Sequence, residues 1–261
     1  MRIQVISLRS AVARRRSIEQ QFAKIDTSFE FFDAICPQDA LDHIEGYDEQ
    51  EFILNCGRGA TDTEIACYAS HLALWRQCAS GGEPFLVLED DAQLDESFLT
   101  GLLVTSCIIR TLGFVRVSRP ELKTSTVIDQ MGPFHIHYCR RAPLLALGYA
   151  LSPDVAARLA ERGGIVEEPV DKFLQRFWRH KEPVFAVTPP FVRLSDLANE
   201  SDIGERHRTG PDARLWLRRA VRKAQNSVLR TLFNALYLGK LRTARQAQAT
   251  VPAATNALRV P

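Results

Sequence analysis

The stretch Phe85-Leu86-Val87-Leu88-Glu89-Asp90-Asp91 decides the fold of this 261-residue chain. Its four apolar residues follow Pro84 and predict a strand that is buried on both faces, as in a parallel sheet covered by helices. The three acidic residues end that strand. Ligands of open α/β sheets collect outside the carboxyl ends of the strands, so these carboxylates mark a candidate binding site.

The elements before this strand alternate between strand and helix. Thr61 or Asp62 is expected to cap the helix that leads into it, and Gly81-Gly82 to end that helix. A βαβαβ order with short connections is typical of a doubly wound α/β sheet. We expect strands at 2–8, 30–34, 85–88, 114–117, 144–151 and 184–187, helices at 11–24, 62–77, 98–110, 153–159 and 172–178, and polar, irregular chain at 37–60.

The charge of the chain is unevenly distributed, although its formal net charge is only +2. From Arg206 to the end there are 12 basic residues and one acid, a net charge of +11, which leaves −9 for residues 1–205. Such a basic tail predicts an anionic partner. No apolar run is long enough for a membrane span, and no signal peptide is expected. Six cysteines without a C-x-x-C pair favour a reduced, cytoplasmic protein.

The acidic cluster Glu89-Asp90-Asp91 has two interpretations from the residues alone. Consecutive carboxylates repel one another and lose favourable hydration when they are buried. A divalent cation compensates for both costs, and oxygen ligands suit Mg²⁺ or Mn²⁺. Alternatively, the acids form a solvated turn and cap the next helix.

Six short motifs follow one another along the chain in a defined order. They are Val5-Ile6-Ser7-Leu8 with Arg15-Arg16, Glu64-Ile65-Ala66-Cys67-Tyr68-Ala69-Ser70-His71, Leu88-Glu89-Asp90-Asp91, Gly148-Tyr149-Ala150-Leu151-Ser152, Pro169-Val170-Asp171 and Ser201-Asp202-Ile203. In this order they resemble glycosyltransferase family 25, the bacterial lipopolysaccharide and lipooligosaccharide glycosyltransferases related to collagen galactosyltransferases. Ser7 and Ala66 depart from the family pattern, which has Asn and Gly there. The resemblance covers about residues 2–205 and is weak over 106–141.

The resemblance implies a GT-A-like fold and an inverting transfer of a hexose, usually galactose from UDP-galactose. The acceptor would be a lipid-linked oligosaccharide. In such a fold Asp91 is expected to contact Mn²⁺ or Mg²⁺, and Glu89 or Asp90 to contact the ribose or to add a second metal ligand. Which carboxylate has which role stays open.

The same resemblance suggests further donor-binding residues near the first strand. Ser7, Leu8 and Arg9 are expected to line the uridine pocket, with Arg15 near the diphosphate. The alternative for Arg14-Arg15-Arg16 is a solvated helix face. Ser70 and His71, on the helix before the acidic strand, belong either to the donor site or to the core.

An inverting transfer needs a base within hydrogen-bond reach of the acceptor hydroxyl. Asp171 is the candidate, and its alternative role is to cap the helix that begins there. Asp202 is a second candidate, as metal ligand or base. His135 and His137, which alternate on a possible strand, form a weaker candidate metal pair.

Residues 206–261 are interpreted as a basic tail outside a glycosyltransferase domain of residues 1–205. A helix over residues 212–238 carries one apolar stripe, a basic opposite side and the aromatic residues Trp216, Phe233 and Tyr237. Basic amphipathic helices with aromatic residues are typical of membrane surfaces. We therefore expect peripheral attachment to the cytoplasmic face of the bacterial inner membrane. The alternative is a helix packed on the acidic body, and nucleic acid is not expected as a partner. The stripe consists of Leu217, Val221, Ala224, Val228, Leu232 and Ala235.

Two other functional classes compete with the transferase: phosphoryl-type α/β proteins and non-catalytic proteins of the same fold. A receiver-type protein carries acids after its first strand, which here ends at Leu8, and an aspartate-nucleophile phosphatase needs D-x-D-x-T; the chain shows neither pattern. A non-catalytic GT-A-like protein that binds a sugar or a partner remains the alternative, because a fold does not fix a function.

Overall fold

The computed structural model describes residues 1–118, 124–195 and 213–249, the last ten of these as backbone only. Among these residues we find no helical stretch with the length and hydrophobicity that a membrane span requires. All six cysteines lie in the described ranges and are free thiols.

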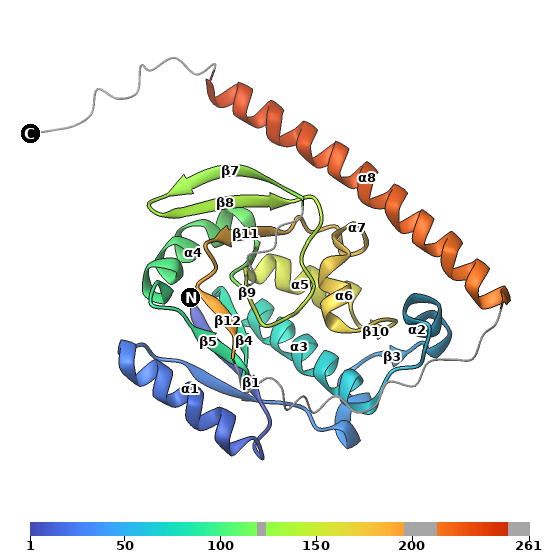
Figure 1. Ribbon diagram of the computed structural model, residues 1–261, viewed down its shortest axis with the longest axis horizontal. Helices are drawn as coiled ribbons and strands as arrows, with labels where there is room; N and C mark the ends of the chain where they lie inside the picture. Colours follow the sequence, from blue (N-terminus) through green and yellow to red (C-terminus); the bar gives the residue numbers. More distant parts are fainter. Residues whose placement is uncertain (119–123, 196–212, 250–261) are drawn as a thin grey trace, which may run out of the picture.

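A mixed eight-stranded sheet forms the centre of the molecule (Figure 1). β1 lies between β2 and β4 and runs parallel to both, whereas β9 runs antiparallel between β4 and β6. The predicted α/β class is confirmed, and the mixed sheet is consistent with the GT-A-like fold that the resemblance implied. In spatial order the strands are β2 (Glu30–Asp33), β1 (Arg2–Ser7), β4 (Phe85–Glu89), β9 (Gly148–Leu151), β6 (Phe114–Arg116), β11 (Phe185–Thr188), β8 (Phe134–Cys139) and β7 (Ser125–Met131).

Helices cover both faces of this sheet, which explains the continuous apolar run of β4. Leu86 and Leu88 pack into one core with α1 and α4, and Phe85 and Val87 pack into the other core with α3, α5 and α6. All four side chains are at most 1% exposed. The prediction of a strand buried on both faces is therefore confirmed. The covering helices are α1 (Val12–Ile25), α3 (Asp62–Gly81), α4 (Phe98–Leu112), α5 (Pro153–Arg162) and α6 (Val170–Gln175).

α3 begins and ends where the sequence predicted. The Thr61 side chain accepts from the backbone N–H of Glu64, and the Glu64 carboxylate accepts from the N–H of Thr61, a reciprocal capping box. Gly82 ends the helix with a positive φ of 69°, which glycine adopts without a steric penalty. Both ends of α3 are thus fixed by local sequence. The positions of its residues along the sheet are fixed as a result.

Several short elements differ from the sequence prediction. Residues 37–60 were expected to be irregular, but they form η1 (Pro37–His43), β3 (Gly46–Tyr47) and α2 (Glu49–Cys56), because β3 pairs with a distant strand and Asp48 caps α2. The helix predicted at 172–178 is divided at Arg176 into α6 and α7. The remaining short elements are β5 (Ala92–Leu94), β10 (Ile165–Val166), α7 (Phe177–His180) and β12 (Val192–Leu194).

The predicted tail helix is present as α8 (Ala213–Ala249), which lies along the outside of the body (Figure 1). Its Arg222 pairs with Glu51 of α2 at 2.7 Å, and Phe233 and Tyr237 pack against aromatic rings of the body. We had expected these two aromatic side chains to be interfacial, and that expectation is wrong. Trp216, by contrast, is 71% exposed.

Candidate active site

A cleft lies at the carboxyl ends of the parallel strands β1, β2 and β4. At this point the order in which the chain adds strands to the sheet reverses, from one side of β1 to the other. From β1 the chain reaches β2 through α1 on one face, and it returns to β4 on the other side of β1 through α3 on the opposite face. Ligands bind at such switch points in open α/β sheets. The cleft has a volume of about 250 Å³ and is lined by Ile6, Ser7, Leu8, Arg14, Ala34, Ile35, Pro37, Thr63, Ala66, Cys67, Ser70, His71, Glu89, Asp90 and Asp91.

The structure therefore brings together most of the residues that the sequence singled out. Seven of them line this one cleft: Ser7, Leu8, Ser70, His71, Glu89, Asp90 and Asp91. Arg9, Arg15 and Asp171 lie outside its lining, and Asp202 is outside the described residues. Arg14 and Cys67 line the cleft although neither was chosen from the sequence, where Arg14 was weighed only as part of a basic helix face.

Asp90 is held in place by two neighbouring elements. The Ser7 hydroxyl, at the end of β1, donates to Asp90 Oδ2 at 2.6 Å. The Arg14 guanidinium, on α1, lies 3.5 Å from Asp90 Oδ1. This carboxylate connects β1, α1 and β4 at the floor of the cleft, and Arg14 adds a positive charge there.

Asp91 differs from its two acidic neighbours because one of its oxygens has no partner. Oδ1 is shielded from solvent and makes no hydrogen bond to any described residue. Burial, followed by the charges of Glu89 and Asp90, raises the pKa of Asp91 to about 7. None of the three acids caps α4, since that helix starts after Ser97. A shielded carboxylate oxygen beside two other carboxylates fits a divalent cation, which Asp91 would hold together with Glu89 or Asp90.

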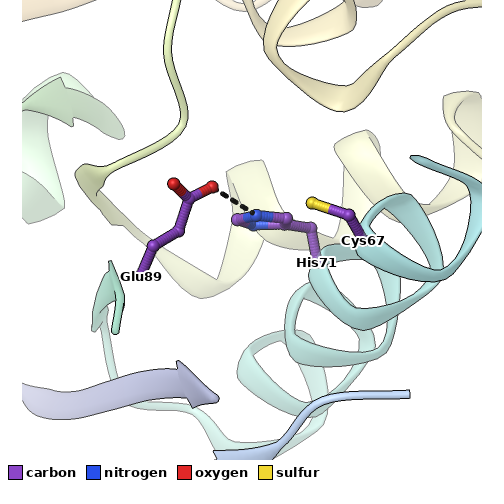
Figure 2. A group of neighbouring side chains, drawn as sticks. All are labelled: Cys67, His71 and Glu89. Carbon is purple, nitrogen blue, oxygen red and sulfur yellow. Dashed lines mark hydrogen bonds and ion pairs between the residues drawn. The ribbon is translucent and has the colours of Figure 1, made fainter. Parts of the chain in front are cut away.

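His71 is both a core residue and a cleft residue. Its side chain is fully buried, and Nε2 lies 3.4 Å from Glu89 Oε1 (Figure 2). On the other side of the ring, Nδ1 lies 2.6 Å from the Tyr149 hydroxyl, which also accepts from Trp75 Nε1 at 3.0 Å. Because the indole can only donate, the hydroxyl proton of Tyr149 is free to point to Nδ1. The imidazole proton then sits on Nε2 and faces Glu89, so this chain of side chains orients the carboxylate.

Ser70 builds the wall of the cleft. Its hydroxyl donates to the Ala66 carbonyl at 2.8 Å and accepts from the backbone N–H of Ile35 at 2.9 Å. The bond to Ala66 fixes the hydroxyl on its own helix, and the bond from Ile35 ties α3 to the chain that leaves β2. Both Ser70 and Ile35 line the cleft.

Arg15 and Arg9 lie next to the cleft and are not part of its lining. Arg15 Nη2 donates to the Ser7 carbonyl at 2.8 Å, Nε donates to the Leu8 carbonyl at 3.1 Å, and the guanidinium also pairs with Asp33. Arg9 pairs with the same carboxylate at 2.7 Å. Hydrogen bonds from both arginines lower the pKa of Asp33. Arg15 therefore fixes the end of β1, and Arg14 supplies the basic group inside the cleft.

Asp171 stands at the start of α6, close enough to the cleft to act on it electrostatically. Its Oδ1 accepts from the backbone N–H of Lys172 at 2.7 Å. Together with burial and Glu89, its charge raises the pKa of Cys67, which lines the cleft. The expected base therefore lies within electrostatic reach of the cleft but outside its lining.

The histidine pair on β8 has other partners. Both ring nitrogens of His137 lie within hydrogen-bond distance of hydroxyl groups, Thr188 Oγ1 at 2.8 Å and Ser125 Oγ at 3.1 Å. Within residues 1–118, 124–195 and 213–249, the group of three side chains that could hold a metal ion is Cys67, His71 and Glu89. The structure thus offers no third ligand to His135 and His137 in these ranges.

Residues 1–124 match the model of glycosyltransferase family 25, described as lipopolysaccharide biosynthesis proteins. The lacto-N-neotetraose biosynthesis glycosyltransferase LgtE of Neisseria gonorrhoeae is 26% identical over 258 residues, which cover 85% of this chain and 90% of that protein.

Two shorter matches are more similar in sequence. The lipooligosaccharide biosynthesis protein lic2B of Haemophilus influenzae is 39% identical over 95 residues, or 36% of this chain and 34% of that protein. The glycosyltransferase LgtB of Neisseria meningitidis serogroup B is 34% identical over 102 residues, 37% of this chain and 34% of that protein. These two alignments span about a third of each relative.

The fold, the cleft and these relatives together support a glycosyltransferase as the class of the protein. Within that class, the resemblance to glycosyltransferase family 25 is confirmed by the match over residues 1–124.

Proposed function

We propose that this chain is an inverting glycosyltransferase that moves a hexose from a UDP-sugar onto the oligosaccharide of a lipopolysaccharide or lipooligosaccharide. Galactose from UDP-galactose is the first donor to test. The observation that carries the proposal is the shielded Oδ1 of Asp91, which has no hydrogen-bond partner among the described residues and lies beside Glu89 and Asp90 in the cleft at the switch point of the sheet.

The cleft lining combines apolar and charged residues, as a nucleotide donor requires. Ile6, Ala34, Ile35, Pro37 and Ala66 give it apolar surface that suits a nucleobase and its ribose. The same lining includes the three carboxylates and the guanidinium of Arg14. A bound Mn²⁺ or Mg²⁺ supplies positive charge that stabilises the departing diphosphate. Asp91, with Glu89 or Asp90, would hold that ion, and Arg14 adds a fixed positive group in the same space.

Asp171 is the proposed base. An inverting transfer requires a group that accepts the proton of the acceptor hydroxyl while the sugar is transferred. Asp171 lies at the start of α6 within electrostatic reach of the cleft, and one of its oxygens accepts a hydrogen bond from the Lys172 N–H, which fixes the orientation of the carboxylate. Asp202 stays a second candidate, as base or metal ligand.

The acceptor class is proposed from the relatives. LgtE and LgtB are described as lacto-N-neotetraose biosynthesis glycosyltransferases, and lic2B as a lipooligosaccharide biosynthesis protein. An acceptor of the same class, an oligosaccharide carried on lipid, would be present at a membrane surface.

A donor screen tests the proposal. The full-length protein is incubated with Mn²⁺ and each of several UDP-hexoses, with and without a truncated lipooligosaccharide, and released UDP is measured. We expect one donor, UDP-galactose first, to give UDP release that the acceptor accelerates. Asp171→Asn should lower acceptor-dependent transfer by at least about 100-fold, the usual contribution of a positioned base. Binding of the UDP-sugar without turnover of any donor would favour the non-catalytic alternative.

We further propose that α8 attaches the enzyme to the cytoplasmic face of the anionic inner membrane. The side chains that contact the body, such as Arg222, Asn226, Phe233, Asn234 and Tyr237, lie on one side of the helix. On the helical wheel, the predicted apolar stripe points the other way, and its large members are at least half exposed: Leu217, Val221, Val228 and Leu232, joined by Leu236.

Charge decides between a membrane and a second copy of the helix as the occupant of this face. The sequence from Ala213 to Ala249 contains nine basic residues and no acid, and one of the nine, Arg222, is paired with Glu51 of the body. Two such helices face to face would repel each other, whereas an anionic lipid surface attracts juxtamembrane Lys and Arg residues by about 1 kcal/mol each. The exposed apolar side chains then enter the interface, as in other surface-bound amphipathic helices.

Vesicle flotation tests the attachment. The parent protein should float with vesicles that contain phosphatidylglycerol and much less with neutral vesicles. The triple variant Val221→Gln, Val228→Gln, Leu232→Gln should lose flotation. A control triple variant at exposed apolar sites elsewhere, Val12→Gln, Leu41→Gln, Leu103→Gln, should float like the parent. Equal flotation of the stripe variant, or a dimer that only the stripe variant abolishes, would refute membrane attachment.

A further inference from the structure

Cys67, His71 and Glu89 form a compact cluster inside the cleft (Figure 2). Cys67 and His71 are four residues apart on α3, so their side chains project from the same face of the helix, and Glu89 approaches them from the end of β4. The thiol sulfur, one imidazole nitrogen and one carboxylate oxygen all lie within 4.8 Å of one another. All three residues line the cleft.

The three donor atoms suit zinc better than manganese or magnesium. Thiolate, imidazole and carboxylate are the ligands of zinc sites, whereas Mg²⁺ and Mn²⁺ prefer oxygen. In a tetrahedral site with bonds of about 2.0–2.1 Å, the nitrogen and oxygen ligands are about 3.3 Å apart. His71 Nε2 and Glu89 Oε1 are 3.4 Å apart already, without an ion between them. The Cys67 sulfur lies within 4.8 Å of both of these groups.

The surroundings of His71 also match those of a metal ligand. Ligating histidines use their second ring nitrogen in a hydrogen bond that fixes the ring. Here Nδ1 lies 2.6 Å from the Tyr149 hydroxyl, which Trp75 holds in turn. With an ion on Nε2, the imidazole proton moves to Nδ1 and is donated to Tyr149 Oη, so the hydroxyl proton of Tyr149 turns away from the ring, and the Cys67 proton is released to solvent.

We propose that Cys67 Sγ, His71 Nε2 and Glu89 Oε1 bind one Zn²⁺ ion, with the fourth coordination position open to the cleft. This site adds sulfur and nitrogen ligands to Glu89 Oε1 and is therefore different from the oxygen-ligand site proposed at Asp91. With Glu89 bound to zinc, the second carboxylate of the Asp91 site would be Asp90. The open position is accessible to water or to an oxygen atom of a bound molecule.

Cobalt spectroscopy tests the site in the full-length protein. Protein stripped with a chelator is titrated with Co²⁺, whose thiolate complex has a ligand-to-metal charge-transfer band that oxygen-only complexes lack. The parent should develop this band with one equivalent of Co²⁺, and Zn²⁺ should abolish it. Loss of a residue that only hydrogen-bonds to a metal ligand lowers the metal affinity about 10–100-fold. Because Cys67 is itself a proposed ligand, Cys67→Ala should lower the Zn²⁺ affinity by at least about 100-fold.

Two further variants keep the test decisive. Cys107→Ala, on the exposed side of α4, should retain the band and the affinity of the parent. Glu89→Gln, at a partly exposed position, should weaken Zn²⁺ binding at least about tenfold while keeping the thiolate band. A parent without the band, or an unchanged band in Cys67→Ala, would overturn the proposal. The readout contains no sugar nucleotide, so this failure is distinct from a failure of the transferase proposal.

Discussion

Glu89, Asp90 and Asp91 are neighbours in sequence but have three different surroundings. Glu89 faces His71, and Asp90 receives the Ser7 hydroxyl beside Arg14. Asp91 keeps a shielded oxygen without a partner among the described residues. The sequence predicted the position of the cluster because an acidic run follows a buried strand. It could not assign the roles, because the partners come from β1, α1 and α3.

Arg14 and Arg15 illustrate the same limit. Consecutive helical residues point about 100° apart, so only one of the two can face the cleft. Arg14 faces it, and Arg15 instead binds the carbonyl groups of Ser7 and Leu8. Residue type and spacing do not decide which one turns inward, since that depends on the angle at which α1 packs on the sheet.

His180 should make the stability of the protein depend on pH. Its side chain is fully buried, Nε2 donates to the Leu174 carbonyl, and Nδ1 accepts from the N–H of Glu182. Burial lowers the pKa of His180 to about 3, below the 6.5 of an exposed imidazole. Below pH 6.5 the unfolded chain therefore binds a proton that the folded protein does not, and the folded state loses up to about 1.4 kcal/mol per pH unit.

Urea unfolding of the parent and His180→Gln between pH 8 and pH 4 measures this effect. The free energy of unfolding of the parent, relative to that of His180→Gln, should be constant above pH 6.5 and should decrease as the pH falls below 6.5. Leu174→Ala removes a buried neighbour without a titrating group, so its destabilisation should not depend on pH through this mechanism. A constant difference between the parent and His180→Gln down to pH 4 would contradict the assignment.

At the scale of elements, α3 carries Cys67, Ser70 and His71, so its N-terminal anchor controls one wall of the cleft. Arg58 and Glu64 form two bonds of 2.6 Å there, and both side chains are nearly buried. Removal of one member of a buried ion pair leaves an uncompensated charge, which costs about 3–5 kcal/mol. Glu64 also completes the capping box with Thr61.

We therefore expect Glu64→Gln to lower the free energy of unfolding by about 3 kcal/mol, because Arg58 loses its counter-charge. The matched control is Glu83→Gln, whose partner Arg2 lies 3.5 Å away at an exposed position. Exposed pairs contribute about 0–1 kcal/mol, so that variant should unfold close to the parent. Denaturant unfolding of the two variants compares them directly, and equal losses would show that the buried pair has no special role.

Elements with a clear local signal were predictable from the sequence, including the short strands β2, β6 and β11, whereas β7, the longest strand of the sheet, was not predicted. β4 and α3 follow from an apolar run and from a cap followed by apolar residues at helical spacing, which are local signals. The pairs β3–β10 and β5–β12 join segments about 120 and 100 residues apart and contain two or three residues each, so no local period indicates them. The stripe of α8 was also predicted, but the face that packs on the body depends on Phe233 and Tyr237 meeting aromatic rings of the body.

At the scale of the whole molecule, the near-neutral net charge results from an acidic body and a basic helix laid against it. Part of that opposite charge is used inside the molecule, as in the pair between Arg222 and Glu51. The cleft with its carboxylates opens at the edge of the sheet where β1, β2 and β4 end, and α8 turns its apolar stripe away from the body. In the proposed account the cleft performs the transfer, and the outer face of α8 keeps the enzyme near its lipid-borne acceptor.

The central claim is that Asp91 holds a metal ion for a nucleotide donor in this cleft, and a calorimetric titration with UDP tests it most directly. The parent should bind UDP at least about tenfold more tightly with Mn²⁺ than without it, and Asp91→Asn should lose this dependence on Mn²⁺. Asp95→Asn is the matched control, because Asp95 bonds to Ser97 and Arg193 outside the cleft lining and its variant should bind UDP like the parent. Metal-dependent binding of UDP by Asp91→Asn with the affinity of the parent would contradict the claim.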